Sequence, residues 1–132
     1  MSEIKMPFRE DMQKAILEGR KTMTCRTKRY GSPGDFFMVG DARFMLTSVT
    51  KMNLGIVATQ FYKDEGTSSP GEFINLWDEI HPRRNFTSLQ TVWAHRFRHD
   101  YGYPCMDCKF ETYDEKEWDE HEKQNPGHDF YA

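Results

Sequence analysis

The sequence lacks any long apolar run, and this absence excludes a membrane-spanning helix. Within 132 residues no apolar stretch approaches the roughly 18 residues that such a helix needs. Instead, 30% of the side chains are charged. The polar N-terminus also has no apolar core of the kind found in signal peptides. We therefore expect a cytoplasmic protein that makes no membrane contact.

Cysteine is also scarce, and the three cysteines do not provide a disulfide framework. Cys105 and Cys108 form a Cys-x-x-Cys pair, and Cys25 is far from both. This usage fits a metal site and one lone thiol in a reducing compartment. A glycine-rich phosphate loop is absent as well, which argues against a nucleotide hydrolase.

The net charge of −3 conceals two regions of opposite sign. Residues 109–132 carry three lysines against eight acidic side chains, whereas residues 1–108 carry 15 basic against 13 acidic side chains. The basic clusters of the first region are compatible with a nucleic-acid surface, although solvated charge is the alternative. These clusters are Arg20, Lys21, Arg26, Lys28 and Arg29; Arg83 and Arg84; and His95, Arg96, Arg98 and His99.

Apolar residues at helical spacing predict two short helices. The first covers Phe8 to Leu17, with Pro7 before it and Gly19 at the position where it should end. The second begins after Ser69, because Ser69-Pro70-Gly71-Glu72 is a capping box with proline at the first helical position. His81-Pro82 should end this helix.

Aromatic and β-branched residues predict several strands. Phe36–Val39 and Ala42–Val49 read as a hairpin around Gly40-Asp41, and further strands are expected at Gly55–Phe61 and Val92–Arg98. The order of helices and strands does not follow regular βαβ alternation. An α+β fold with a curved or closed, mostly antiparallel sheet is therefore predicted.

The densest functional pattern is Gly-Arg-Lys-Thr-Met-Thr-Cys-Arg at residues 19–26, directly after the first helix. It brings together Gly19, Lys21, Thr24 and Arg26. A glycine that ends a helix, followed by a lysine, a hydroxyl and an arginine, indicates a loop that holds an anionic or carbonyl-bearing ligand.

On these residues the chain resembles the ASCH superfamily, over roughly residues 5–98. The signature of that family is Gly-x-Lys-x-x-Glu-x-Arg; Gly19, Lys21 and Arg26 match it, and Thr24 replaces the glutamate. The replacement is similar to the bacterial branch that removes the acetyl group from N4-acetylcytidine, where lysine and threonine stand at these positions. The resemblance implies a PUA-like, mostly antiparallel β-barrel with short flanking helices over residues 1–100.

The resemblance also implies a later glutamate that completes a catalytic triad. Glu65 is the candidate, because Lys63-Asp64-Glu65-Gly66 follows a predicted strand and precedes the capped helix. Glu72 is the rival, but its spacing from Ser69 already gives it a capping function. Cys25 has no adjacent histidine to activate it, so it is expected to be a buried apolar residue.

The implied reaction assigns one step to each residue of the triad. Thr24 would attack the amide carbon, Lys21 would act as base if its pKa is lowered by a nearby cation, and Glu65 would protonate the departing amine. Substrate binding would involve the neighbouring positions of the same segment, with Arg26 orienting the ligand or holding Glu65. These positions are Gly19, Arg20, Arg26 and Lys28.

Two other functions remain open at this point. The same basic cleft can serve a non-catalytic RNA-binding module, with aromatic side chains stacking on bases. Cleavage of RNA by the lysine and hydroxyl pair is the third interpretation. The candidate stacking residues are Tyr62, Trp77, Phe86 and Trp93, although Trp77 and Trp93 are expected to lie in the core.

The C-terminal segment, residues 101–132, is predicted to bind a structural Zn²⁺. Cys105, Cys108, His121 and His128 have the order and nearly the spacing of a Cys₂His₂ site. So short a segment cannot bury enough surface to fold alone, and a metal would supply the missing stability. Its helical region, Asp114 to His121, is too acidic to approach phosphates, which favours a structural brace or a protein contact.

Overall fold

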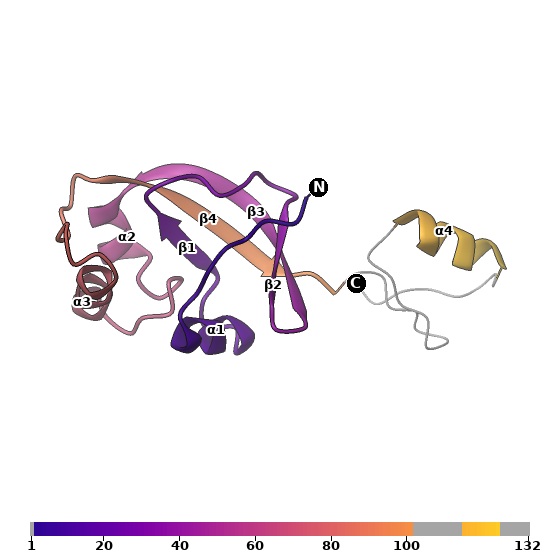
Figure 1. Cartoon of the computed structure of the whole chain (residues 1–132), viewed down its shortest axis with the longest axis horizontal. Coiled ribbons are helices and arrows are strands. Elements are labelled where there is room, and N and C mark those ends of the chain that lie inside the picture. The colour runs from indigo at the N-terminus through magenta and orange to yellow at the C-terminus, as the bar shows by residue number, and fades with distance from the viewer. Residues whose placement is uncertain (1, 102–114, 125–132) are drawn as a thin grey trace. The chain divides into compact units, whose positions relative to one another are not determined.

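The computed structural model describes residues 2–101 and 115–124, in two compact units, Met1–His99 and Asp100–Ala132 (Figure 1). In the second unit the described residues form the helix α4 (Glu115–Gln124). None of the helices in these two described stretches is long and apolar enough to cross a membrane. The first unit is α+β, with the element order α1 (Glu10–Leu17), β1 (Met23–Arg26), β2 (Phe36–Val39), β3 (Ala42–Asn53), α2 (Leu54–Gln60), α3 (Pro70–Ile80) and β4 (Thr91–His99).

The four strands form one antiparallel sheet in the order β1-β4-β3-β2. The long strands β3 and β4 lie side by side, and their register shifts between Leu46 and Ser48. Such a bulge bends the bulged strand and increases its twist. The sheet is therefore a curled half-barrel, which confirms the predicted antiparallel curvature, but β1 and β2 do not close it into a barrel within the described residues.

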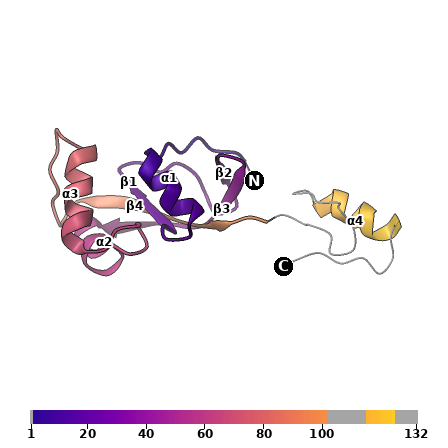
Figure 2. The same cartoon turned by 90° about the horizontal axis from the view of Figure 1, so that it is seen from below.

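Two hydrophobic cores pack against this sheet. Figure 2 shows α2 and α3 gathered at one end of the sheet, and α1 nearer to the hairpin of β2 and β3. The first core joins β1 and β4 to these two helices and contains Met23, Cys25, Leu54, Val57, Ala58, Phe73, Trp77, Val92 and Ala94. The second core joins α1 to the hairpin and contains Met6, Ile16, Phe37, Val39, Phe44, Leu46 and Phe97.

Both predicted helices are confirmed, as α1 and α3. Gly19 follows α1 with a φ of +79°, in the region that glycine adopts most readily. Ser69 caps α3, since its side-chain oxygen accepts a hydrogen bond from the Glu72 backbone N at 3.1 Å. The predicted hairpin and the predicted strand at Val92–Arg98 are also present, as β2 with β3 and as β4.

The predicted strand at Gly55–Phe61 is wrong, because these residues form α2. Leu54, Val57 and Ala58 are buried at helical spacing, so the period of the apolar positions outweighs the β-branched composition. The loop before β4 also accepts hydrogen bonds from the first turn of the helix. The Leu54 N donates to Gln90 O at 2.8 Å, and Gly55 N donates to Ser88 O at 2.9 Å.

Candidate functional site

The end of α1 delivers Lys21 to the centre of the first unit. The backbone N groups of Arg20 and Lys21 both donate to Ala15 O, at 2.9 and 3.1 Å, which fixes the chain as it leaves the helix. Lys21 then pairs with Glu65 in an isolated antiparallel bridge. Two residues 44 positions apart in the sequence are therefore neighbours in the backbone as well as in the side chains.

A tight turn after α2 carries Glu65 to this position. Thr22 N and Met23 N both donate to Asp64 O, at 2.8 and 3.0 Å, so the turn is bound to the chain entering β1. Gly66 has a φ of +90°, and a Cβ there would lie 3.2 Å from the Lys21 Cβ. Glycine is thus required both for the backbone conformation and for the close approach to Lys21.

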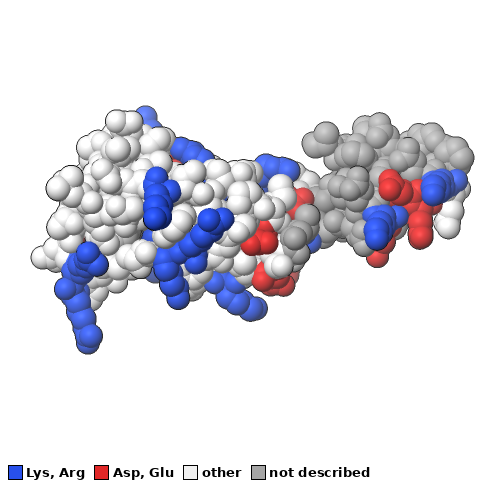
Figure 3. Space-filling model, turned by 90° about the horizontal axis from the view of Figure 1, so that it is seen from above, with Lys and Arg blue, Asp and Glu red and all other residues white. Residues whose placement is uncertain are grey.

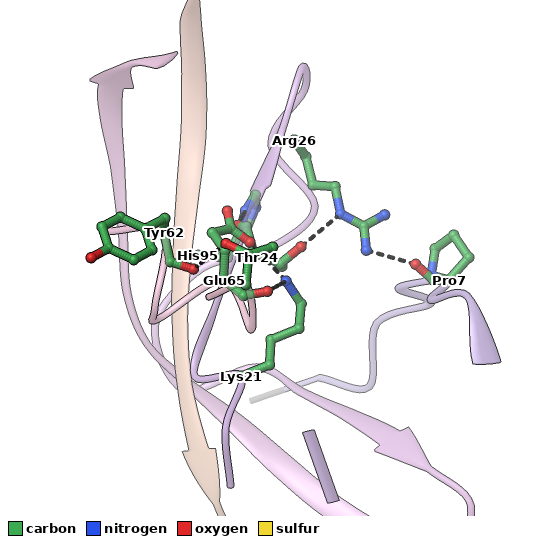
Figure 4. Close-up of polar contacts among 8 residues, drawn as sticks. Pro7, Lys21, Thr24, Arg26, Tyr62, Glu65 and His95 are labelled. Carbon is green, nitrogen blue, oxygen red and sulfur yellow. Dashed lines mark hydrogen bonds and ion pairs between the residues drawn. The ribbon is translucent and has the colours of Figure 1, made fainter. Parts of the chain in front are cut away.

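Lys21 and Glu65 form a buried ion pair (Figure 4). Lys21 Nζ donates to Glu65 Oε2 at 2.7 Å and to the Glu65 backbone O at 3.0 Å. Each side chain is only 5% exposed. Removing a charge from water costs roughly several kcal/mol per ion, so a buried ion pair is weak evidence that the pair stabilises the fold. It is a stronger indication of a site in which charge or protons are used.

Thr24 and Arg26 lie on β1 beside this pair. Arg26 Nε donates to Thr24 Oγ1 at 3.1 Å, and Arg26 Nη2 donates to Pro7 O at 2.6 Å. The guanidinium also lies over the rings of Phe8 and Tyr30, at 4.9 and 5.3 Å from their centroids. Burial lowers the pKa of Arg26, but a guanidinium remains a cation in proteins. Arg26 therefore orients the Thr24 hydroxyl.

A cavity of about 140 Å³ opens over these four side chains. Lys21, Thr24, Arg26 and Glu65 form its polar side. The other lining residues are mostly apolar and come from the chain around α1 and from α3. These apolar residues include Phe8, Met12, Phe73, Leu76, Trp77 and Ile80. An apolar cavity with a few convergent polar groups is the usual form of a small-molecule site.

Cys25 also lines the cavity, but its environment keeps the thiol protonated. The side chain is 6% exposed and belongs to the first core. Burial, followed by the neighbouring Glu65 carboxylate, raises the pKa of Cys25 well above its usual value. A thiolate is the nucleophilic form, so this environment agrees with the prediction that Cys25 is an apolar core residue.

His95 holds the backbone on which Thr24 stands, and it was placed wrongly in the predicted basic surface because it is completely buried. Tyr30 N donates to His95 Nε2 at 3.1 Å, so Nε2 carries no proton. The neutral ring must then bear its proton on Nδ1, which lies 3.3 Å from Thr24 O. His95 therefore joins β4, β1 and the chain at Tyr30 in one neutral tautomer.

This arrangement predicts a loss of stability in mild acid. Burial lowers the pKa of His95 from its ordinary 6.5, so the unfolded chain binds the proton more readily than the folded one. The contribution is present above pH 6.5 and is lost below it, by at most about 1.4 kcal/mol per pH unit. Urea unfolding between pH 7.5 and 5 should show a shallower pH dependence in His95→Gln. Equal slopes in both proteins would exclude His95 as the cause.

The remaining predicted site residues lie outside the cavity wall. Gly19, Arg20 and Lys28 are exposed, and Arg20 pairs with Glu18. Glu72 lies in the first turn of α3, where its backbone N donates to the capping Ser69 and its side chain accepts a hydrogen bond from Ser68, and it does not line the cavity. The predicted zinc ligands Cys105, Cys108 and His128 lie outside the described residues. His121 belongs to α4, but its side chain is likewise not described.

Sequence reasoning missed two features of the site. The position of His95 opposite Thr24 follows from strand pairing, which no local motif encodes. Trp77 is buried as predicted, yet it also forms part of the cavity wall. Trp93 was expected in the core, but it is only half-buried. It lies near the start of β4 with Arg29 and Lys51 beside its ring.

The comparisons with known proteins define the fold of the first unit as that of the ASCH domain, a PUA-like half-barrel. The ASCH domain from Lactobacillus crispatus is 17% identical with a TM-score of 0.55, over 74% of this chain and 78% of that chain. The hypothetical protein PH0355 is 16% identical with a TM-score of 0.57, over 76% and 100%. Protein PF0455 from Pyrococcus furiosus is 17% identical with a TM-score of 0.51, over 75% and 97%. No protein-family model matches the sequence, and no curated protein is significantly similar to it.

Proposed function

We propose that the cavity binds a nucleobase and that the protein hydrolyses the amide of N4-acetylcytidine or a close relative of it. One observation carries this proposal: Lys21 and Thr24 from the segment after α1 and Glu65 from the turn after α2 meet, each about 95% buried, at one cavity. The apolar residues that line the same cavity suit a flat, uncharged ring. The same three residue types are those that the resemblance to the amidohydrolase branch implies.

The buried ion pair can supply both a base and an acid. In the resting state Lys21 Nζ donates to Glu65 Oε2 across 2.7 Å. Transfer of that proton to Glu65 produces a neutral amine beside a carboxylic acid, which are the two groups that amide cleavage requires. Thr24, whose hydroxyl accepts a hydrogen bond from Arg26, is the candidate nucleophile that this pair would activate.

The reaction then proceeds in two halves. Thr24 Oγ attacks the acetyl carbon while its proton passes to Lys21 Nζ, and the C–N bond breaks as Glu65 gives its proton to N4. Cytidine leaves, an acetyl ester remains on Thr24, and the ion pair is restored. In the second half the proton again passes from Lys21 to Glu65, Lys21 Nζ then takes a proton from the water that attacks the ester, and Glu65 returns one to Thr24 Oγ. Acetic acid leaves and ionises to acetate in solvent, and the hydroxyl and the ion pair are regenerated. Lys21 must reach Thr24 on substrate binding, because catalytic hydrogen bonds often tighten only in the complex.

The direct test is incubation of the purified protein with N4-acetylcytidine, followed by chromatography for cytidine and acetate. We expect both products from the wild type and from Lys14→Ala, whose side chain is exposed on α1. Lys21→Ala should lose about 10²- to 10⁴-fold in turnover, the usual contribution of a general base. Absence of product at high protein concentration would refute the amidohydrolase function.

A non-catalytic RNA-binding module is the second candidate, and a cationic aromatic surface favours it. Trp93 lies on the sheet with Arg29 at 5.4 Å and Lys51 at 5.2 Å from its ring centroid. Figure 3 shows Lys and Arg side chains spread over one face of the first unit. Stacking of a base on such a ring contributes roughly 1–3 kcal/mol, and the cations would contact phosphates.

This candidate predicts binding that weakens steeply with salt. Anisotropy of a labelled single-stranded RNA should give a linear dependence of log affinity on log salt concentration. Lys51→Ala should reduce that slope by about 0.7 for the phosphate contact that it removes. An RNA that does not bind even at low salt would exclude the module.

We further propose that residues 101–132 hold one structural Zn²⁺ through Cys105, Cys108, His121 and His128. The support is the spacing of these residues together with the small size of the segment. Metal analysis of the purified full chain should find about one zinc per chain. Cys105→Ser should lose the metal, whereas Cys25→Ser should retain it, because Cys25 is buried in the first unit. Far less than one zinc in the wild-type protein would contradict this site.

A further inference from the structure

Two residues that line the cavity each carry a buried polar atom with no hydrogen-bond partner among the residues that the structure describes, and together these atoms indicate what a ligand must present. They are Trp77 Nε1, a donor, and Glu65 Oε1, an acceptor. We infer that Trp77 Nε1 donates to a ring acceptor of a nucleobase while Glu65 Oε1 accepts from its exocyclic amine. The ligand class rests on the proposed function, whereas the unpartnered atoms do not.

Unpartnered buried polar atoms are rare in folded proteins. Most are satisfied by protein or by ordered water, and the indole N–H of a buried tryptophan usually finds an acceptor. Trp77 is 5% exposed and Glu65 is 4% exposed, so bulk water does not solvate either group freely. That a donor and an acceptor are left over in the wall of one cavity points to a ligand that satisfies both.

The surroundings of Glu65 leave one of its oxygens for this purpose. Lys21 Nζ donates to Oε2 and to the backbone oxygen of Glu65, and neither bond involves Oε1. The Cys25 thiol is also close to the carboxylate, but a thiol is a weak donor. An amine of the ligand is a better partner for Oε1 than this thiol.

Ring contacts hold the Trp77 indole in place. The indole stacks on the His81 ring, with centroids 4.1 Å apart and an interplanar angle of 25°. The Phe73 ring, on the preceding turn of α3, lies beside the indole, with the ring centroids 6.2 Å apart. His81 is itself held by a contact of Nδ1 with Trp77 O at 3.0 Å. The donor is therefore set in place before a ligand arrives.

A cytosine edge matches this pair of atoms. It presents the exocyclic N4 amine next to the ring acceptor N3, so a donor and an acceptor stand side by side. With N4 at Glu65 Oε1, the nitrogen that must receive a proton in the proposed reaction lies at the residue that supplies it. Trp77 is then the positioning residue that aligns the base, and it discriminates against bases with an N–H at the ring position, such as uracil.

The test uses cytidine, which the protein does not consume. In ¹⁵N-labelled protein we expect one indole Nε1–H resonance to move downfield on titration with cytidine and not with uridine. Trp77→Phe, which removes this resonance and so assigns it, should bind cytidine about tenfold or more weakly, because a buried ligand acceptor is left unpaired. Thermal unfolding of Trp77→Phe checks that the variant is folded.

The outcomes separate this inference from the proposed function. Cytidine binding with the Trp77 shift, but without hydrolysis of N4-acetylcytidine, supports the inference and refutes the amidohydrolase. Hydrolysis with an unmoved Trp77 resonance and unchanged Trp77→Phe affinity supports the amidohydrolase and overturns the inference. Equal affinity for uridine, or no binding of cytidine at all, also overturns it. If Trp77→Phe does not fold, Trp93→Phe and Trp118→Phe assign the remaining indole resonance to Trp77 by elimination, and its shift with cytidine decides.

Discussion

Lys21→Met is expected to lower the free energy of unfolding by about 3–5 kcal/mol, although the two side chains have similar length. The substitution leaves the Glu65 carboxylate buried, 4% exposed, without the cation that donates to it at 2.7 Å. Breaking a buried pair costs more than removing both members, since an uncompensated charge remains. Urea unfolding at pH 7.5 measures the loss.

The double variant Lys21→Met, Glu65→Leu distinguishes this cause from simple loss of packing. It should recover most of the stability, because buried ion pairs are often replaced by apolar residues without net cost. Arg20→Met is the matched control, since Arg20 is exposed and its pairing with Glu18 lies at the surface. A Lys21→Met protein as stable as the Arg20→Met protein would show that the charge is not buried in solution.

Thr24→Val is expected to abolish the proposed hydrolysis, by about 10³-fold or more, while the protein remains folded. Valine has nearly the shape of threonine and suits a buried β-strand position, so only the hydroxyl and its hydrogen bond from Arg26 Nε are lost. The measurement is the rate of cytidine release from N4-acetylcytidine. Mass spectrometry should also find an acetyl adduct on the wild-type peptide that contains Thr24.

Thr59→Val is the control for the loss of a hydroxyl. Thr59 lies on α2, is exposed, and donates to Gly55 O at 2.9 Å, away from the cavity. Its turnover should equal that of the wild type. If Thr24→Val keeps turnover within a few-fold and no adduct forms, a water molecule rather than Thr24 attacks the amide, and Lys21 would have to activate that water.

Local patterns predicted those parts of the fold whose signals are local. The capping serine before α3, the glycine after α1 and the hairpin turn each act within a few residues, and each is present in the structure. The segment at Leu54–Gln60 was predicted wrongly because Ile56, Val57 and Thr59 favour strands by type. Its buried residues follow the helical period, and contact with the chain before β4 decides the outcome.

The site was predictable only in part for a related reason. Lys21 and Thr24 stand in one short segment, so the sequence itself brings them together. Glu65 was chosen by resemblance, and its meeting with Lys21 depends on the turn at Gly66 and on a backbone bridge across 44 positions. The supporting contacts of His95 with Thr24 and Tyr30 arise from strand pairing and have no counterpart in any local motif.

The strand β4 contributes side chains to both cores, so the packing of both cores depends on its register. Val92 and Ala94 point into the first core, whereas Phe97 points into the second, three residues further on. A slip of one residue against β1 would turn both sets of side chains the wrong way at once. The misaligned sheet would therefore lose packing in both cores and would be less stable than the native sheet. The correct pairing, with Thr24 opposite His95, is selected by the whole interior and not by the site itself.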